Sequence, residues 1–213
     1  MHIPKIIHQI WIGPKKRPDI WMDSVRDFCK VFDYEYKLWN DDNVKDLNLT
    51  NQKYYNKEQS YHGKADILRY ELLYKYGGVF IDADSVIVKP EKFHDLLLNF
   101  KSDAGFGFEI DNVLVCQGVC MSISNSRFMK KCIEEIPNRD FTKLPWQSTG
   151  PMLVTEIIKK NNDISITIYK STIFYPRRWH GIQDIQMHKT YPIPEESVMF
   201  QYGYSTNNLE SKI

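Results

Sequence analysis

The sequence has 213 residues, of which 42% are hydrophobic and 14% aromatic, so it can bury a core of ordinary size within a single domain. Its 28 Lys and Arg residues balance 27 Asp and Glu residues to a net charge of +1, which argues against nucleic acid as a partner. No run approaches the ~20 apolar residues of a membrane span, and the apolar run near the N-terminus is too short for a signal peptide. We therefore expect a cytoplasmic protein with no membrane segment.

The cysteines do not indicate a metal site or a disulfide framework. There are four of them, they form no CxxC pair, and no spaced set of His and Cys matches a zinc site. Buried free thiols are the commoner use of so few cysteines. This agrees with a reducing compartment.

The first sixty residues predict a strand, a helix and a second strand. Residues 6–12 form a short apolar run that a glycine and a proline close, which is typical of a buried strand. Apolar spacing predicts a helix over residues 19–32, and alternation predicts a strand over residues 34–39. Residues 40–60 are polar with weak periodicity and predict a surface loop or a small helix.

A second helix and strand follow directly. Apolar residues at positions i, i+3, i+7 and i+11 predict a helix over residues 61–76. Gly77 and Gly78 come next, and such a pair usually ends a helix. Residues 79–81 are fully apolar, as at the start of a buried strand, and the acidic run DADSV comes immediately after them.

The remainder continues as a mixed α/β pattern. We predict extended chain over residues 85–88, paired strands around a glycine over 113–124, and late strands over 164–168 and 172–175. Further helices are predicted over residues 91–100, 126–136 and 151–160. There is no internal repeat, so a single mixed α/β unit is expected.

Asp82 and Asp84 stand two residues apart at the end of the apolar strand. In an extended backbone both carboxylates project to the same side and can share one cation. Oxygen ligands favour a hard divalent ion, Mn²⁺ or Mg²⁺, which offsets the charge that grows on a leaving diphosphate. The alternative is a turn whose carboxylates cap backbone amides.

A phosphatase motif is a second alternative for the same residues. DADSV at residues 82–86 also matches the DxDx[TV] motif of haloacid-dehalogenase-like phosphatases, in which Asp82 would attack phosphorus. That pattern needs a late acidic pair, and the Asp-Asp pair of this chain, at residues 41 and 42, precedes the motif. The phosphatase interpretation is therefore disfavoured.

The residues around the carboxylate pair carry a longer pattern. KADILRY at residues 64–70 and YKYGGVFIDAD at residues 74–84 resemble the DXD-containing sugar-transferase region, family 32-like. This family includes α-mannosyltransferases of the yeast initiation type, capsular-polysaccharide transferases and the glucosyltransferase domains of large clostridial toxins. IPKIIHQIWIG at residues 3–13 and TGP at residues 149–151 resemble further elements of it. The likeness extends to glycosyltransferases of large DNA viruses, which act in the host cytoplasm.

The resemblance implies a GT-A fold, a Rossmann-like mixed sheet flanked by helices, with the donor across the carboxyl ends of the strands. It implies that the indole of Trp11 stacks on the base, while Asp66 accepts sugar hydroxyls and Arg69 steadies phosphate. Asp66 and Arg69 share one helix face because they are three residues apart. The donor-binding residues that it implies are Gln9, Ile10, Trp11, Asp66, Arg69, Phe80, Asp82 and Ala83, with Asp82 and Asp84 holding the metal.

The chain departs from this family in two places. The usual H-H-W-x-x-S-W-like element near the end, which helps to close the metal site, corresponds here to MFQYGYS at residues 199–205. The third metal ligand is therefore open. The candidates for it are Gln201, Tyr202, Ser205, His180 and His188. Gln117 stands in what resembles the place of an Asn that touches the sugar, so it joins Asp82 and Asp84 as a candidate catalytic residue.

We expect from this resemblance a retaining glycosyltransferase that moves a hexose from a UDP-sugar, such as UDP-glucose, to a glycan or protein-linked acceptor. A guanosine donor is the fallback. Mn²⁺ or Mg²⁺ would lie at the diphosphate, and attack on the face that the nucleotide leaves would need no protein nucleophile. Residues 1–110 would form the donor half and 111–213 the acceptor half of one domain, which a longer protein could contain. The alternative is a catalytically impaired module that binds nucleotide sugar or glycan.

Overall fold

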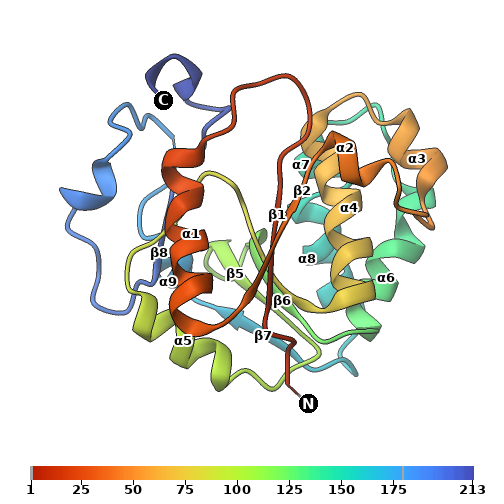
Figure 1. The fold of residues 1–213 in the computed structure, drawn as a ribbon. Helices are drawn as coiled ribbons and strands as arrows, with labels where there is room; N and C mark the ends of the chain where they lie inside the picture. Colours follow the sequence, from red (N-terminus) through yellow and green to blue (C-terminus); the bar gives the residue numbers. More distant parts are fainter. Residues whose placement is uncertain (1, 179) are drawn as a thin grey trace.

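The computed structural model describes residues 2–178 and 180–213, and its centre is a mixed six-stranded sheet (Figure 1). β1 runs parallel to β2 and β3, β6 runs antiparallel to β3 and β5, and β7 runs parallel to β5. In spatial order the strands are β2 (Glu35–Trp39), β1 (Ile6–Ile10), β3 (Gly78–Ile81), β6 (Leu114–Ser122), β5 (Ala104–Ile110) and β7 (Ile166–Tyr169).

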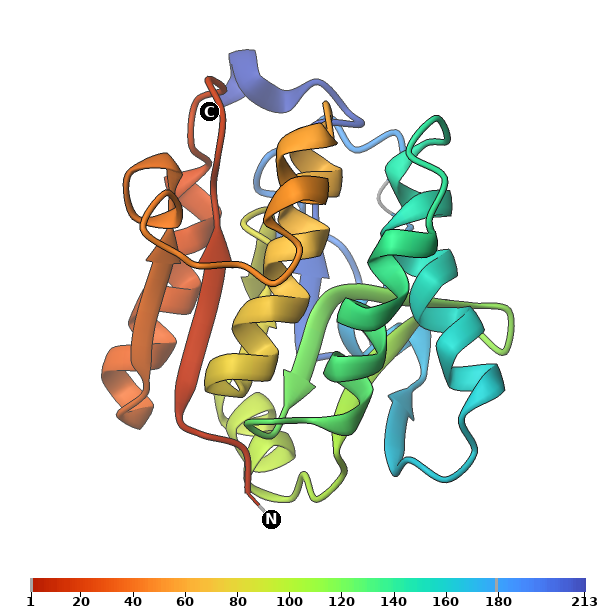
Figure 2. The same ribbon diagram turned by 90° about the vertical axis from the view of Figure 1, so that its right-hand side faces the viewer.

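Helices cover both faces of this sheet (Figures 1 and 2). One face carries α4 (Tyr61–Tyr76), α6 (Arg127–Glu135) and α8 (Pro151–Lys160), whose apolar residues form one core cluster. The other carries α1 (Asp19–Phe32), α5 (Pro90–Leu98) and α9 (Ser171–Phe174), which contribute to a second cluster. Short helices complete the fold, namely α2 (Asp41–Val44), α3 (Gln52–Lys57), α7 (Pro145–Ser148), η1 (Ile136–Asn138), η2 (Met187–Lys189) and η3 (Leu209–Lys212). Within the described ranges, no helix has the length and apolarity needed to cross a membrane.

A second, two-stranded sheet joins distant parts of the chain. β4 (Ser85–Ile87) pairs antiparallel with β8 (Met199–Gln201), with Ser85 opposite Gln201. Phe200 of β8 belongs to a third core cluster, which also contains Trp21 and Tyr202. The stretch at residues 199–205 is thereby held against the residues that directly follow β3.

Glycines make the turn between α4 and β3 possible. Gly77 has a φ of +63°, and its N–H donates to the carbonyl of Leu73, which ends the helix. Gly78 has a φ of +94°, and a Cβ there would lie 2.4 Å from the carbonyl oxygen of Ile6 on β1. The tight turn therefore delivers β3 to the centre of the sheet, directly beside β1.

The structure confirms the expected α/β class and corrects two predicted elements. The predicted hairpin at residues 113–124 is wrong, because this stretch is the single strand β6, whose partner β5 contains Gly105 and Gly107 and shows no clear alternation. The predicted strand at residues 172–175 is wrong as well. It is helix α9, and Asp111, distant in sequence, accepts hydrogen bonds from the N–H and hydroxyl of Ser171 at its start.

Candidate functional site

The chain turns sharply at Asp82 and Asp84, at the carboxyl end of β3. The N–H of Ser85 donates to the carbonyl of Asp82 at 3.1 Å, so these residues form a turn, and the expected extended backbone is wrong here. The N–H of Asp82 donates to the carbonyl of Gly118 on β6 at 2.7 Å, and that of Tyr202 donates to the carbonyl of Asp84 at 3.0 Å. Strands of both sheets thus fix the turn.

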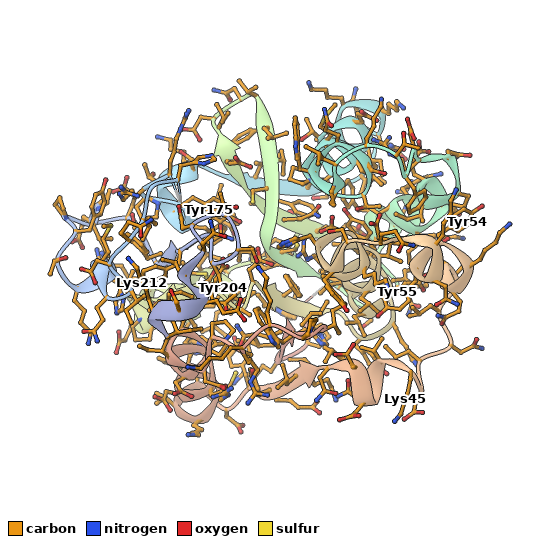
Figure 3. All side chains as sticks on the ribbon, turned by 90° about the horizontal axis from the view of Figure 1, so that it is seen from above. Lys45, Tyr54, Tyr55, Tyr175, Tyr204 and Lys212 are labelled. Atoms are coloured by element: carbon orange, nitrogen blue, oxygen red, sulfur yellow. The ribbon has the colours of Figure 1, made fainter. Side chains whose placement is uncertain are left out.

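The two carboxylates lie together, and each has one oxygen tied to a hydrogen-bond donor. Arg69 donates to Oδ1 of Asp82 at 3.0 Å, and the N–H of Tyr204 donates to Oδ2 of Asp84 at 2.7 Å. Figure 3 labels Tyr204, on the blue segment near the end of the chain. The other oxygens, Oδ2 of Asp82 and Oδ1 of Asp84, face Nε2 of Gln201 at 3.0 and 3.5 Å.

Burial disfavours the charged form of both acids. It raises the pKa of Asp82 to about 7, with Arg69 acting in the opposite direction and Asp84 adding to the rise. It also raises the pKa of Asp84, which the N–H of Tyr204 opposes. The side chain of Asp82 still exposes 28% of its surface, so it can be reached from outside.

Asp66 lies beside this pair at the centre of a buried polar network on α4. Its Oδ1 accepts from Gln117 at 2.6 Å and from Arg69 at 3.3 Å, and its Oδ2 accepts from Thr149 at 2.9 Å. Burial raises the pKa of Asp66, and Arg69 opposes the rise. Although burial lowers the pKa of Arg69, the carboxylates of Asp82 and Asp66 raise it above its usual value. Arg69 is thus a charged link between the two acids.

Gln117 contacts Asp66 with one end of its amide and a tyrosine with the other. The hydroxyl of Tyr70 lies 2.8 Å from Oε1 of Gln117 and 2.6 Å from the carbonyl of Thr149. Gln117 is 2% exposed, so it lies behind Asp66 rather than at the open surface. Sequence reasoning did not single out Tyr70 or Thr149, although both stand within the quoted ADILRY and TGP patterns.

The predicted base and ribose contacts lie at the end of β1. Gln9 is fully buried, donates to the carbonyl of Asp82 at 3.3 Å and accepts from the hydroxyl of Tyr36 at 2.9 Å. Ile10 belongs to the core. Trp11 is partly exposed, and its ring meets that of Tyr204 edge-on with centroids 5.5 Å apart. Of these side chains, the indole of Trp11 is the one open to a ligand.

Phe80 and Ala83 are buried residues next to Arg69 and the two acids. The ring of Phe80 is 2% exposed and lies 4.1 Å from the guanidinium carbon of Arg69. Ala83 is 7% exposed between the two acids. Phe80 is thus placed to hold the guanidinium in position through a cation–π contact.

Among the candidate third ligands, Gln201 contacts both carboxylates with its side chain. The ring of Tyr202 stacks on that of Trp21 with centroids 4.4 Å apart, and its hydroxyl bonds to Nδ1 of His188. Across residues 2–178 and 180–213, no group of three His, Cys, Asp or Glu residues is suited to hold a metal ion. The carboxylates of Asp82 and Asp84 are oxygen donors of the kind that suits a hard divalent cation.

Comparison with known proteins shows that the sequence around this site is similar to glycosyltransferases. Residues 18–100 match the family model described as a glycosyltransferase sugar-binding region containing a DXD motif. The chain is 34% identical to inositol phosphoceramide mannosyltransferase 3 of Schizosaccharomyces pombe, over 38% of this chain and 24% of that protein. It is 32% identical to an uncharacterized glycosyltransferase of Acanthamoeba polyphaga mimivirus, over 41% of this chain and 38% of that protein. The matches thus span well under half the length of these relatives.

Solved structures resemble the whole fold. The PaToxG glycosyltransferase superposes with a TM-score of 0.58 at 18% identity, over 75% of this chain and 70% of that one. A glycosyltransferase involved in glycosylation of the major capsid of PBCV-1 superposes with a TM-score of 0.57 at 9% identity, over 99% of this chain and 100% of that one. These likenesses confirm the expected GT-A fold.

Proposed function

We propose that the chain is a metal-dependent glycosyltransferase, because its residues 18–100 match the model of glycosyltransferase sugar-binding regions that contain a DXD motif. It moves a hexose from a nucleotide-diphosphate donor to a glycan or protein-linked acceptor. The reaction retains the configuration of the transferred sugar. The donor is a UDP-sugar such as UDP-glucose, and the ion at the diphosphate is Mn²⁺, with Mg²⁺ as the substitute.

The observation that carries this proposal is the convergence of the two carboxylates at the carboxyl edge of the sheet. Asp82 and Asp84 each keep one oxygen that faces neither Arg69 nor the N–H of Tyr204. Burial and mutual repulsion both disfavour two ionised carboxylates that lie side by side. A divalent cation between them offsets this cost. Such a cation supplies charge stabilisation to the leaving diphosphate. This support does not depend on the identity of the sugar.

The proposed roles of the other residues follow from their contacts. Asp66 orients the donor sugar through the acceptor capacity that remains on its carboxylate, and Arg69 holds Asp66 and Asp82 in register. Gln117 acts through Asp66 as a positioning residue. The open face of Trp11 stacks on the base of the nucleotide. Catalysis then rests on placement and charge stabilisation, without a protein nucleophile.

The donor sugar and the two halves of the domain belong to the same proposal. We assign donor binding mainly to residues 1–110 and acceptor binding to residues 111–213. The yeast relative is named as a mannosyltransferase, which keeps mannose as a candidate for the transferred sugar. A guanosine-diphosphate donor is therefore the alternative to UDP.

Calorimetric titration of UDP with and without Mn²⁺, on wild type and on Asp84→Asn, tests the proposal. We expect binding that needs both the ion and Asp84, followed by slow hydrolysis of one donor from a panel of UDP-glucose, UDP-galactose and GDP-mannose. Asp46→Asn, the same change at an exposed residue, serves as the matched control and should bind as wild type does. Binding without metal and without hydrolysis would instead favour the nucleotide-sugar or glycan-binding module.

A further inference from the structure

Gln201 reaches the carboxylate pair from the second sheet. It is the last residue of β8, and its pairing with Ser85 fixes its backbone opposite the residue that directly follows the DAD turn. Nε2 lies 3.0 Å from Oδ2 of Asp82 and 3.5 Å from Oδ1 of Asp84. These are the two carboxylate oxygens that Arg69 and Tyr204 leave free. The amide therefore occupies the point on which both free oxygens converge.

The other end of this amide has no partner. Oε1 of Gln201 is buried and accepts no hydrogen bond from the residues that the structure describes, while the residue as a whole is 9% exposed. A buried carbonyl oxygen without a partner is destabilising. The carboxylates of Asp82 and Asp84 determine how the amide of Gln201 is oriented, because they accept hydrogen bonds from its NH₂ group and would repel its oxygen. A half-turn of the amide would exchange the two atoms.

The spacing of these atoms matches the ligands of a small divalent ion. Neighbouring oxygens of an octahedral ion with bonds of ~2.1 Å stand about 3.0 Å apart. After the half-turn, Oε1 would stand close to the present place of Nε2, 3.0 and 3.5 Å from the two free carboxylate oxygens. Room at this point depends on Gly118, because a Cβ there would lie 2.7 Å from Oδ2 of Asp82.

We propose that the side-chain oxygen of Gln201 is the third protein ligand of a divalent cation that Asp82 and Asp84 hold, and that the amide turns over when the ion binds. The inference rests on the proposed function for the presence of the ion. It assigns to a neutral amide a place that the family fills from a different C-terminal element. Binding to the ion would also give Oε1 of Gln201 the partner that it lacks.

The test measures Mn²⁺ binding in the presence of UDP by titration of the free-ion EPR signal, on wild type, Gln201→Leu and Gln201→Glu. Leucine should weaken binding at least about tenfold, the lower end of the loss that even an outer partner of a metal ligand causes. Glutamate restores an oxygen ligand and should bind Mn²⁺ at least as tightly as wild type. If Gln201 only separated the carboxylates by hydrogen bonding, glutamate would bind no better than leucine.

Two outcomes separate this inference from the proposed function. Wild type that does not bind Mn²⁺ would overturn the metal-dependent function itself. Wild type and Gln201→Leu that bind Mn²⁺ equally would overturn only the role of Gln201. Should the leucine variant not fold, the side-chain ¹⁵N signal of Gln201 in wild type gives the answer, because Mg²⁺ with UDP must shift it if the amide turns, and an unchanged signal contradicts the proposal.

Discussion

Gly118 stands where any side chain would collide with the candidate metal ligands. A Cβ at this position would lie 2.7 Å from Oδ2 of Asp82, 3.1 Å from Nε2 of Gln201 and 3.2 Å from the hydroxyl of Tyr175. The surroundings are buried, so the methyl group of an alanine must displace one of these groups. Asp82 is the most exposed of the three and has the most room to move.

Gly118→Ala should therefore weaken binding of Mn²⁺ with UDP by about tenfold or more. Gly105→Ala is the control, because its Cβ would collide with the ring of Phe100 at 2.5 Å, far from the acids. The control should lose ~1–3 kcal/mol of unfolding free energy and keep its metal affinity. Metal titration and urea unfolding on both variants check this, and unchanged metal affinity in Gly118→Ala would contradict the expected crowding.

His8 on β1 is buried and makes two hydrogen bonds. The indole N–H of Trp39 donates to Nδ1 at 3.1 Å, and Nε2 lies 2.9 Å from the carbonyl of Gly77. Because the indole is only a donor, Nδ1 must be the unprotonated nitrogen and Nε2 carries the hydrogen. Burial lowers the pKa of His8 from 6.5 to about 4, against the contribution of the Gly77 carbonyl.

This pKa predicts a specific loss of stability in acid. The unfolded state binds more protons than the folded state between pH 6.5 and 4, so the contribution of His8 is complete above pH 6.5 and is lost as pH falls toward 4. Relative to His8→Gln, wild type should lose about 2 kcal/mol of unfolding free energy between pH 7 and pH 5. Urea unfolding of both proteins at both pH values measures this difference. The contributions of other titrating groups are common to both proteins and cancel. Parallel pH profiles would show that His8 is charged in the fold.

At the scale of elements, a bulge in β6 brings two site residues into place. Phe106 of β5 pairs with Cys120 and Gly107 pairs with Cys116, so residues 117–119 have no partner on β5. Their backbone groups are satisfied elsewhere. The N–H of Val119 donates to the hydroxyl of Tyr175 at 2.9 Å, and the carbonyl of Gly118 accepts from the N–H of Asp82. The bulge thus carries Gln117 toward Asp66 and Gly118 toward Asp82.

Tyr175→Phe removes the acceptor that the buried N–H of Val119 needs. Such a loss costs roughly 1–3 kcal/mol of unfolding free energy. Tyr169→Phe is the matched control, since the hydroxyl of Tyr169 makes no hydrogen bond in the part of the chain that the structure describes, and it should stay near wild type. Chemical denaturation measures the unfolding free energy of both variants. Equal stability would show that water accepts the hydrogen bond from the N–H of Val119.

Elements whose pattern is local could be predicted from the sequence. The helices at residues 19–32, 61–76 and 151–160 match their predicted bounds, because the signals for them are local, such as Gly77 directly after the second helix and Pro151 at the start of the third. β8 and α9 depend on partners far away in the chain. β8 has three residues and exists by pairing with β4. No window of the sequence contains that information.

The same contrast applies to the candidate site. Asp66, Arg69, Asp82 and Asp84 stand within one continuous motif that points to them together. The structure joins the first three through Arg69, and it links Asp82 to Asp84 through the amide of Gln201. Gln201 was one of five open candidates for the third ligand, because its approach to the acids requires the second sheet. The bulge that turns Gln117 inward likewise depends on the register of β5.

At the scale of the whole molecule, the candidate site joins the two sheets. Asp82 follows a strand of the main sheet, whereas Gln201 and Tyr204 come from β8 and the segment after it. A ligand that binds at this junction must therefore stabilise both sheets against separate opening. At a hundredfold excess over Kd it adds ~2.7 kcal/mol, which raises Tm by about 5 to 10 °C for a domain of this size.

Hydrogen exchange tests where this stabilisation acts. UDP with Mn²⁺ should slow exchange at residues 61–88 and, far away in sequence, at residues 199–205, while β7 at the opposite edge of the sheet changes least. Gln201→Leu should keep part of the protection at 61–88 and lose most of it at 199–205, since the second sheet would no longer be tied to the ion. Protection confined to residues 61–88 in wild type would mean that the donor binds to the main sheet alone. The backbone of β8 would then stabilise the DAD turn without contributing a ligand, and another part of the chain would have to close the site.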